Sequence, residues 1–226
     1  SDNVQFVLQD SARRIWIGTD KGLYCWKDNA LQCVDKSHSF QRACSFKGKT
    51  CFITVDGEIR TADKEGRLSL AAKLPDVSYG LDLPGNLAVG SQWVIFTSEG
   101  SFVFDTESNM LRPSPPEWNI PGGEVSVDNR GNYWVHNKTG KLYYIRSGTG
   151  AVKVFQLMPR EKVGYIDMER YHVVHDSRDI LWISTYGNGL FTYDLRTDEL
   201  RHFKADDSRS SLISSDRKST RLNSSH

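Results

Sequence analysis

The chain has 226 residues, of which 38% are hydrophobic, and this suits one large or two small globular domains. Its net charge is +1, from 29 basic and 28 acidic residues. A balance so close to neutral argues against a phosphate-binding surface, and no apolar run approaches the ~18 residues of a membrane helix. We therefore expect a globular chain with no nucleic-acid partner and no membrane contact of its own.

The two ends of the sequence need separate treatment. The chain opens at Ser1 without an initiator Met or a signal-peptide pattern, which suggests a piece of something longer or a processed form. The last stretch, DRKSTRLNSSH at 216–226, looks like the in-frame translation of a sequencing-library adapter. We expect it to be an artefact without a fold; the alternative is a natural disordered tail. Without it, 26 basic residues stand against 27 acidic ones, a net charge of −1.

From Val4 onward, one layout of four short strands and their turns recurs. Each copy has an apolar second strand, then a Gly that opens the third strand, then a polar turn and a last strand. The copies are expected at residues 4–35, 40–74, 79–113, 122–157 and 168–204. The opening glycines are Gly22, Gly57, Gly100, Gly140 and Gly189, at intervals of 35, 43, 40 and 49 residues.

Periods near 40 residues with four strands each are typical of propeller blades. The sequence therefore predicts an all-β fold, a β-propeller in the form of an incomplete arc of about five four-stranded blades. At a seven-blade pitch the gap would be about two blades. The alternative is that five blades close tightly into a small propeller.

The middle strands read as continuous apolar runs such as IWI and LWI, because neighbouring sheets cover both of their faces. Three tryptophans fall at the same place in their copies and are expected to fill space between sheets: Trp16, Trp134 and Trp182. The aspartates Asp10, Asp128 and Asp176 are interpreted as turn residues whose carboxylates cap backbone N–H groups. Each opening glycine is expected to take a positive φ.

The cysteines are Cys25, Cys33, Cys44 and Cys51, with no CxxC pair, which excludes a zinc ribbon or a thioredoxin-type motif. If Lys47 and Gly48 form a two-residue turn, Cys44 and Cys51 lie opposite each other in a hairpin. A disulfide there, or between Cys25 and Cys33, is conceivable in an oxidising compartment. The alternative is four reduced, partly buried thiols.

Signatures of catalysis and of cofactor binding are not found. The GKT at Gly48 to Thr50 lacks the upstream glycine of a phosphate loop, and neither a GxSxG elbow nor a GxGxxG fingerprint occurs. His172 and His175 would point to opposite faces of a strand, so they do not suggest a metal pair. We expect no catalytic residues, no metal and no cofactor, and hence no enzymatic activity in this chain.

Ligand binding is better supported. In propellers, the loops that enter each blade and the corners between second and third strands share one rim around the central channel. Here those segments carry aromatic, amide and guanidinium groups, which suit a polar ligand with apolar faces, such as a sugar. The candidate ligand-binding residues are Trp118, Arg160, Tyr165, Tyr186 and Asn188.

Three stretches carry a resemblance to a known family: WIGTDKGLYCW, DNRGNYWVHNKTGKLYYI and, above all, ILWISTYGNGLFTYDLRTDELRHF with the Ser/Leu-rich loop after it. They are similar to the two-component regulator propeller repeat, in which W-I-x-T is followed by G-x-G-L and Y-D-x-x-T. The fifth copy matches closely, the first and fourth fairly, and the second and third weakly. The resemblance covers residues 1 to about 215.

This resemblance implies a periplasmic sensor region of a hybrid two-component system histidine kinase. The implied ligand is an oligosaccharide, and the implied role is to regulate glycan-utilisation genes. The implied partners are the remaining blades and a second propeller of the parent chain, which would act as a homodimer; the kinase domains are not in this sequence. Two other classes stay open, namely a propeller enzyme of the lyase or dehydrogenase type and a scaffold propeller that recruits proteins.

Overall fold

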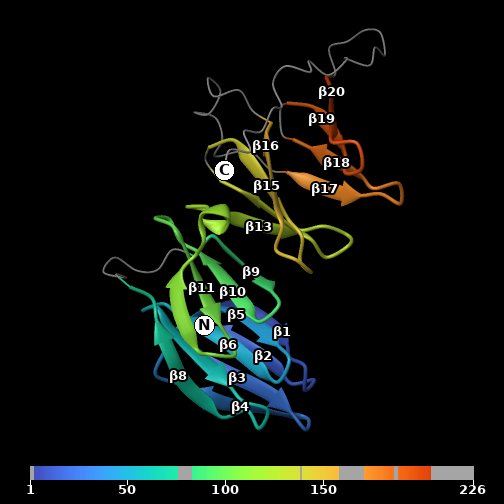
Figure 1. The fold of residues 1–226 in the computed structure, drawn as a ribbon. Coiled ribbons are helices and arrows are strands. Elements are labelled where there is room, and N and C mark those ends of the chain that lie inside the picture. The colour runs from blue at the N-terminus through green and yellow to red at the C-terminus, as the bar shows by residue number, and fades with distance from the viewer. Residues whose placement is uncertain (1–2, 76–82, 138, 158–170, 186–187, 205–226) are drawn as a thin grey trace. The chain divides into compact units, whose positions relative to one another are not determined.

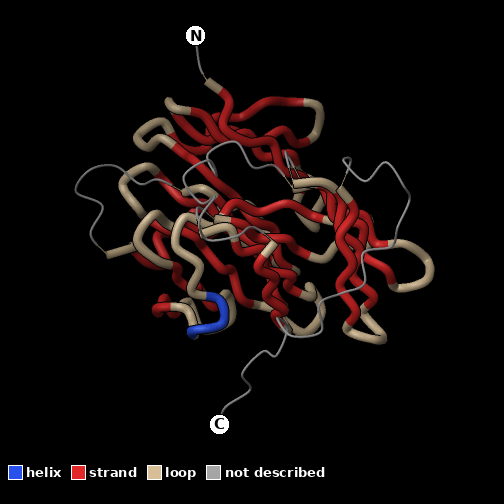
Figure 2. The backbone as a smooth tube through the Cα atoms, turned by 90° about the horizontal axis from the view of Figure 1, so that it is seen from above, coloured by secondary structure: helices blue, strands red, loops and turns tan. Residues whose placement is uncertain are grey.

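A computed structural model of the protein describes residues 3–75, 83–137, 139–157, 171–185 and 188–204 (Figure 1). The chain divides into two compact units. Unit 1 consists of Ser1–Val125 and Ile145–Val152, and unit 2 of Ser126–Tyr144 and Lys153–His226. Strands dominate the described residues, as the tube in Figure 2 shows.

The first sheet contains β1 (Val4–Gln9), β2 (Ile15–Thr19), β3 (Gly22–Lys27) and β4 (Ala30–Asp35), hydrogen-bonded in that order. A Cβ on Gly22 would lie 2.5 Å from the carbonyl oxygen of Asp35, so this corner requires glycine. The turn between β3 and β4 holds two consecutive residues with positive φ, as a tight hairpin turn demands.

The second sheet follows the same order with β5 (Phe40–Phe46), β6 (Lys49–Thr54), β7 (Glu58–Ala62) and β8 (Leu68–Lys73). The predicted two-residue turn between β5 and β6 is confirmed, because Phe46 pairs with Lys49 across it. The cysteines of these two strands lie opposite each other as a result.

The third sheet contains β9 (Gly85–Val89), β10 (Gln92–Phe96), β11 (Ser101–Asp105) and β12 (Met110–Pro113). A short 3-10 helix, η1 (Pro116–Trp118, blue in Figure 2), follows β12. Gly100 precedes β11 without a positive φ, so the expectation for this glycine is wrong. The hydroxyl oxygen of Thr97 accepts a hydrogen bond from the Gly100 N–H. This bond closes the corner without a positive φ at Gly100.

Two apolar layers hold the three sheets of unit 1 together. The layer between the first and second sheets is aromatic, with Trp16 and Phe52 ring centroids 5.0 Å apart. The layer between the second and third sheets is mainly aliphatic. The buried residues of the first layer include Trp16, Leu23, Phe40 and Phe52, and those of the second include Cys51, Ile53, Ile59, Trp93 and Phe104. The second sheet is thus covered on both faces, as its continuous apolar strands predict.

The fourth sheet contains β13 (Glu124–Val127), β14 (Tyr133–His136), β15 (Lys141–Ile145) and β16 (Val152–Gln156). Trp134 of β14 is buried and stacks on Tyr144 with ring centroids 4.6 Å apart.

The fifth sheet contains β17 (His172–His175), β18 (Ile180–Ser184), β19 (Leu190–Asp194) and β20 (Glu199–Phe203). Within unit 2 it packs on fourth-sheet residues through one cluster, where Phe155 and Tyr193 meet edge to face at 4.7 Å.

The prediction of an all-β chain of five four-stranded sheets is confirmed. The arc and its closure stay predictions, and residues 216–226 lie outside the described ranges.

Candidate functional site

Three turns between first and second strands are built around an aspartate that also binds a tryptophan six residues later. One carboxylate oxygen accepts two backbone N–H groups, as predicted, and the other accepts an indole N–H. We name this arrangement the aspartate–tryptophan staple. The indole bonds are Trp16 to Asp10 at 2.8 Å, Trp134 to Asp128 at 3.3 Å, and Trp182 to Asp176 at 3.1 Å. The sequence interpretation missed the indole bond, although the D-x5-W spacing is visible in all three copies.

The staple of the first sheet also fixes a buried arginine. Arg14 Nε donates to Asp10 Oδ2 over 2.7 Å, and its two Nη atoms donate to the carbonyls of Lys64 and Asp63 in the second sheet at 3.1 and 3.0 Å. Burial alone would raise the pKa of Asp10, but the hydrogen bonds from Trp16 and Arg14 and the arginine charge outweigh it. The pKa of Asp10 therefore lies below its ordinary value, and the carboxylate stays charged.

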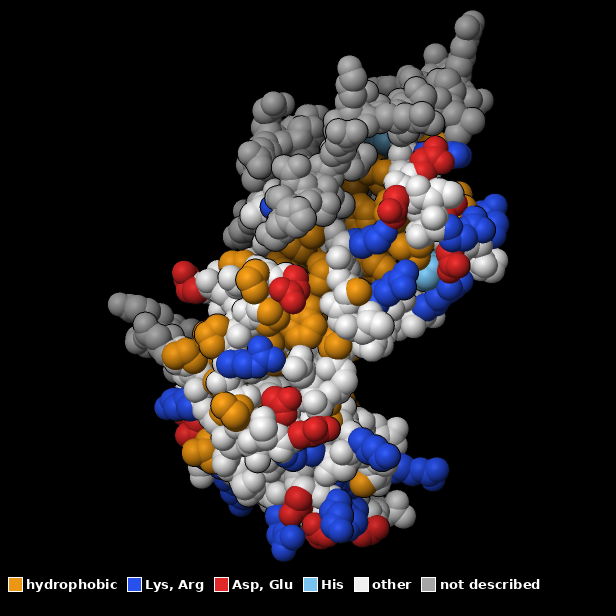
Figure 3. Space-filling model, viewed as in Figure 1, with side chains coloured by type: hydrophobic (Ala, Val, Ile, Leu, Met, Phe, Trp, Pro, Cys, Tyr) orange, Lys and Arg blue, Asp and Glu red, His pale blue; other side chains and the backbone are white. Residues whose placement is uncertain are grey.

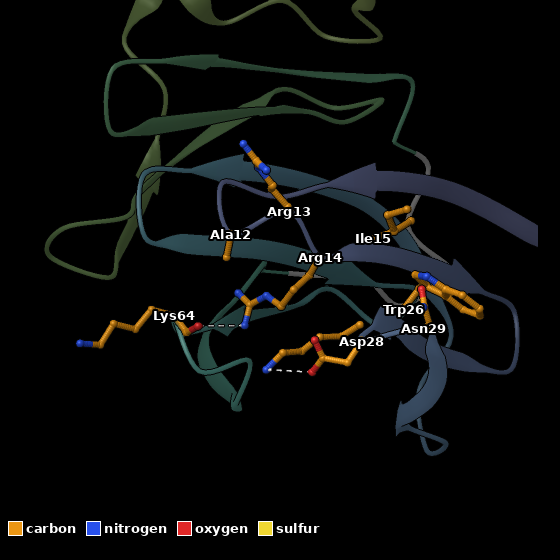
Figure 4. A pocket seen from close by; sticks show the side chains of 9 residues that line it. Ala12, Arg13, Arg14, Ile15, Trp26, Asp28, Asn29 and Lys64 are labelled. Atoms are coloured by element: carbon orange, nitrogen blue, oxygen red, sulfur yellow. Dashed lines mark hydrogen bonds and ion pairs between the residues drawn. The ribbon is translucent and has the colours of Figure 1, made fainter.

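A cavity of about 520 Å³ opens beside this arginine in unit 1 (Figure 4). It lies between the turn of Arg13 and Arg14, the end of β3 with Trp26, and the Lys64 turn of the second sheet. Trp26 is 43% exposed, which provides an aromatic surface next to charged groups.

The charges at this cavity do not converge on one point. The guanidinium of Arg14 donates its hydrogen bonds to the Asp10 carboxylate and to a main-chain carbonyl. Lys27 Nζ lies 4.0 Å from Asp28 Oδ2. Arg13 and Lys64 extend away from the Arg14 guanidinium in Figure 4. The cavity can therefore hold a small polar molecule against Trp26. This cavity was not predicted from the sequence, because the turns between first and second strands were interpreted only as elements of the fold.

Trp118, predicted on the ligand-binding rim, is buried and 8% exposed at the end of η1. Its indole N–H donates to the Gly150 carbonyl over 3.0 Å, and its ring fills the space where a Cβ on Gly150 would stand. The expectation of an exposed aromatic is wrong for this residue. Trp118 closes the short helix η1, which Pro115 precedes and Pro116 begins. The binding role predicted for Trp118 is not tested by this burial.

Asn188, the other rim residue within the described ranges, holds a corner of unit 2. Its side-chain amide donates to the Leu157 carbonyl over 2.8 Å, and its own carbonyl lies 2.6 Å from His202 Nε2. The remaining rim residues, Arg160, Tyr165 and Tyr186, lie outside the described residues. Their predicted role stays a prediction.

The histidines of β17 take the opposite faces that their spacing predicts, because His172 is exposed and His175 is buried. His175 Nε2 lies 3.1 Å from Asp179 Oδ1, while Nδ1 is buried without a hydrogen-bond partner. Within the described ranges, no group of three or more His, Cys, Asp or Glu residues is placed to hold a metal ion. No described helix has the length and apolar character needed to cross a bilayer.

Sequence comparisons find no protein-family model and no curated protein that matches this chain. Solved structures do match. The extracellular domain of a putative hybrid two-component system from B. thetaiotaomicron aligns with a TM-score of 0.56 at 16% identity, over 94% of this chain. A virginiamycin B lyase from Staphylococcus aureus, solved as an inactive variant with quinupristin, aligns with the same TM-score at 14% identity, over 91% of this chain.

These likenesses concern different shares of the matched proteins. The chain spans 30% of the two-component extracellular domain and 71% of the lyase. A second extracellular domain from B. thetaiotaomicron, of a putative one component system, also aligns, with a TM-score of 0.55, and 30% of its length is covered. At these identities the likeness establishes the architecture: the five sheets are those of a β-propeller fold, similar to the extracellular domains of putative one- and two-component systems and to a lyase.

Proposed function

We propose that this chain is part of the ligand-sensing, extracytoplasmic propeller of a hybrid two-component sensor histidine kinase. The observation that carries the proposal is the structural likeness to a two-component extracellular domain over 94% of the chain. The ligand is an oligosaccharide, and the parent protein regulates genes for glycan use from the periplasm. The chain binds, and the kinase chemistry belongs to other domains of a dimeric parent.

The surface supports a neutral, polar ligand. Acidic and basic side chains are interspersed on the described part of the face in Figure 3, without a broad area of one sign. Sugars are bound by aromatic faces with polar groups beside them. The cavity beside Trp26 offers that combination of side chains, and the sequence of the predicted rim carries it in Arg160, Tyr165 and Tyr186.

A glycan array tests the proposal directly. The full chain is labelled and applied to oligosaccharides from plant and host polysaccharides, and hits are measured by calorimetry. The rim variant Arg160→Ala and the cavity variant Trp26→Ala separate the two sites, because each should weaken binding only if its site is used. Gln32→Ala, at an exposed position of β4, is the matched control.

Saturable binding of an oligosaccharide that one of the two variants weakens at least about tenfold supports the proposal; a tenfold loss corresponds to about 1.4 kcal/mol. Absence of binding to every glycan, both by the chain and by a longer chain extended with its parent sequence, contradicts the oligosaccharide assignment. Binding that neither variant changes contradicts both candidate sites.

An enzyme is the second candidate, because the likeness to the lyase has the same TM-score. Incubation of the chain with quinupristin, followed by liquid chromatography with mass spectrometry, measures its conversion. We expect quinupristin to be recovered unchanged, and its conversion to a product would select the enzyme.

We also propose that a further sheet of the parent covers the outer face of the first sheet. Val7 is 65% exposed, and it shares a face with Leu31 and Trp26, so this cover and a ligand in the Trp26 cavity are alternatives for that part of the face. In the second sheet, Phe52 holds the position that Ile17 has in the first, and Phe52 packs on the preceding sheet. Sedimentation tests this: the chain should self-associate through the face, and Val7→Lys should weaken association. A strictly monomeric chain with one cooperative melting transition contradicts it.

A further inference from the structure

The second sheet lacks the aspartate–tryptophan staple. Its first turn has only Lys47 and Gly48, so no aspartate is available. The tryptophan position, three residues before the threonine that ends the second strand, is held by Cys51 before Thr54, as Trp16 stands before Thr19. A small sulfur side chain thus replaces the indole at the centre of this sheet.

The residue opposite that position is also a cysteine. In the first sheet Trp16 faces Leu8, and in the fifth Trp182 faces Val174, but in the second Cys51 faces Cys44. Directly opposed residues of an antiparallel pair have Cβ atoms about 4.5–5.5 Å apart. A disulfide needs about 3.5–4.5 Å between Cβ atoms and about 4.4–6.8 Å between Cα atoms. The pair is therefore within a small backbone adjustment of bonding distance.

Both thiols lie on the face that meets the third sheet. Cys51 is 0% exposed, and Cys44 packs against the same cluster, which includes Ile53 and Trp93. Their side chains therefore share one side of the hairpin, as the register requires, and the third sheet separates them from solvent.

We propose that Cys44 and Cys51 form a cross-strand disulfide that ties β5 to β6 in a sheet that has neither the turn aspartate nor the core tryptophan. Oxidised glutathione or a protein disulfide oxidant is the reaction partner. Each thiol gives up its proton and the pair gives up two electrons, so an Sγ–Sγ bond forms while the partner's disulfide is reduced to two thiols. The proposal is independent of any ligand.

Burial determines when this bond forms. Desolvation raises the pKa of both thiols to about 12, and the neighbouring Cys44 adds to the effect at Cys51. Because thiolate is the reacting species, the folded, reduced chain is slow to oxidise. The bond therefore forms while the hairpin is still uncovered, and the third sheet then protects it from reductants.

Cys25 and Cys33 are an internal control. Cys25 faces Gln32 and Cys33 faces Tyr24, so the two cysteines stand at adjacent pairings and on opposite faces of the first sheet. One is buried and the other exposed. The same oxidation should leave both of them as thiols.

The experiment refolds the reduced, unfolded full chain in a glutathione redox buffer, blocks remaining thiols with an alkylating agent in denaturant, and digests the chain with trypsin. Cleavage after Arg42, Lys47, Lys49 and Arg60 separates the two cysteines onto peptides 43–47 and 50–60. We expect these peptides joined by a disulfide, and peptides 22–27 and 28–36 each alkylated. Cys44→Ser should leave Cys51 alkylated.

Recovery of peptides 43–47 and 50–60 in separately alkylated form overturns the proposal, as does a mixture of pairings that includes Cys25 or Cys33. If the chain does not refold in the buffer, the same digest is applied to chain that has been exported into an oxidising compartment. Peptides 43–47 and 50–60 joined by a disulfide then support the proposal, and their separate alkylation overturns it. A second readout is the denaturant midpoint, which should be higher for the oxidised chain than for the same chain after reduction.

Discussion

The staples of the first and fifth sheets have the same local geometry and different surroundings. Asp10 and Asp176 each accept two backbone N–H groups at 2.8–3.0 Å and one indole N–H. Trp16 is fully buried under the second sheet, whereas Trp182 is half-buried. The turn is therefore a product of local sequence, and its contribution to stability depends on whether a neighbouring sheet covers it.

The arginines beside these aspartates show the same contrast. Arg14 is buried and bonds across to the second sheet, while Arg178 pairs with Asp176 at 2.9 Å on the surface. A surface pair of this kind contributes little, because water and salt screen it. A buried arginine that loses its carboxylate keeps its charge without a counter-charge, which is costly.

The largest effect is expected from Asp10→Ala, which removes the acceptor of Arg14 and Trp16 together. Breaking a buried ion pair from one side typically costs about 3 kcal/mol or more, so the free energy of unfolding should fall by that order. Urea unfolding, with hydrogen exchange at β2 as the local probe, measures it. Asp176→Ala is the matched variant, and its free energy of unfolding should fall clearly less. An equal fall in both variants contradicts the role of the covering sheet.

Trp16→Phe should come next, because it removes one hydrogen bond to a charged group and leaves a ring in place. Such bonds are worth about 2 kcal/mol, to which a small cavity term adds. The same urea measurement on Trp182→Phe provides the comparison. The half-buried site can admit water to the freed carboxylate oxygen, so we expect a smaller loss there.

Acid unfolding separates the two sites further. The pKa of Asp10 lies below its ordinary 3.8, so the folded chain binds fewer protons than the unfolded chain at low pH. The stabilisation is complete above pH 3.8 and is lost as the pH falls through the lowered value. Asp10→Asn should therefore flatten the dependence of stability on pH below about 4. The pKa of Asp176 is lowered too, against the effect of burial, by its hydrogen bonds to Trp182 and the turn. Its contribution should be more sensitive to added salt.

The smallest effect concerns the left-handed residue of these turns. Arg13 has φ 62° where the fourth sheet has Gly131 at φ 80°. A non-glycine residue in this conformation costs about 1–2 kcal/mol, part of which the greater freedom of glycine in the unfolded chain cancels. Arg13→Gly should raise stability by about 0.5 kcal/mol, and Gly131→Ala should lower it. Thermal unfolding of both variants checks the pair of signs, and the same sign in both is inconsistent with the turn geometry.

Much of the fold could be predicted because each copy is specified locally. Short stretches of sequence are enough to predict the positive φ of four opening glycines, the two-residue turn at Lys47 and Gly48, and the register of Cys44 with Cys51. The packing of Trp16 between sheets follows from apolar runs that are covered on both faces.

The site was less accessible to sequence, for physical reasons. In the sequence Trp118 lies in a proline-rich loop, but its ring is buried against Gly150. No local sequence pattern indicates that contact. Arg14 bonds to carbonyls of Asp63 and Lys64, 49 and 50 positions along the chain, and the cavity beside Trp26 exists only once two sheets meet. Such features depend on contacts between copies, which a repeat pattern does not determine.

A double-mutant cycle of Asp10→Ala and Trp16→Phe tests most directly whether one carboxylate joins the turn, the core tryptophan and the next sheet. If it does, the two losses overlap, and the double variant should be more stable than their sum by about 1–2 kcal/mol. Losses that add to within about 0.3 kcal/mol would show that the two residues act independently and would contradict this role for the staple.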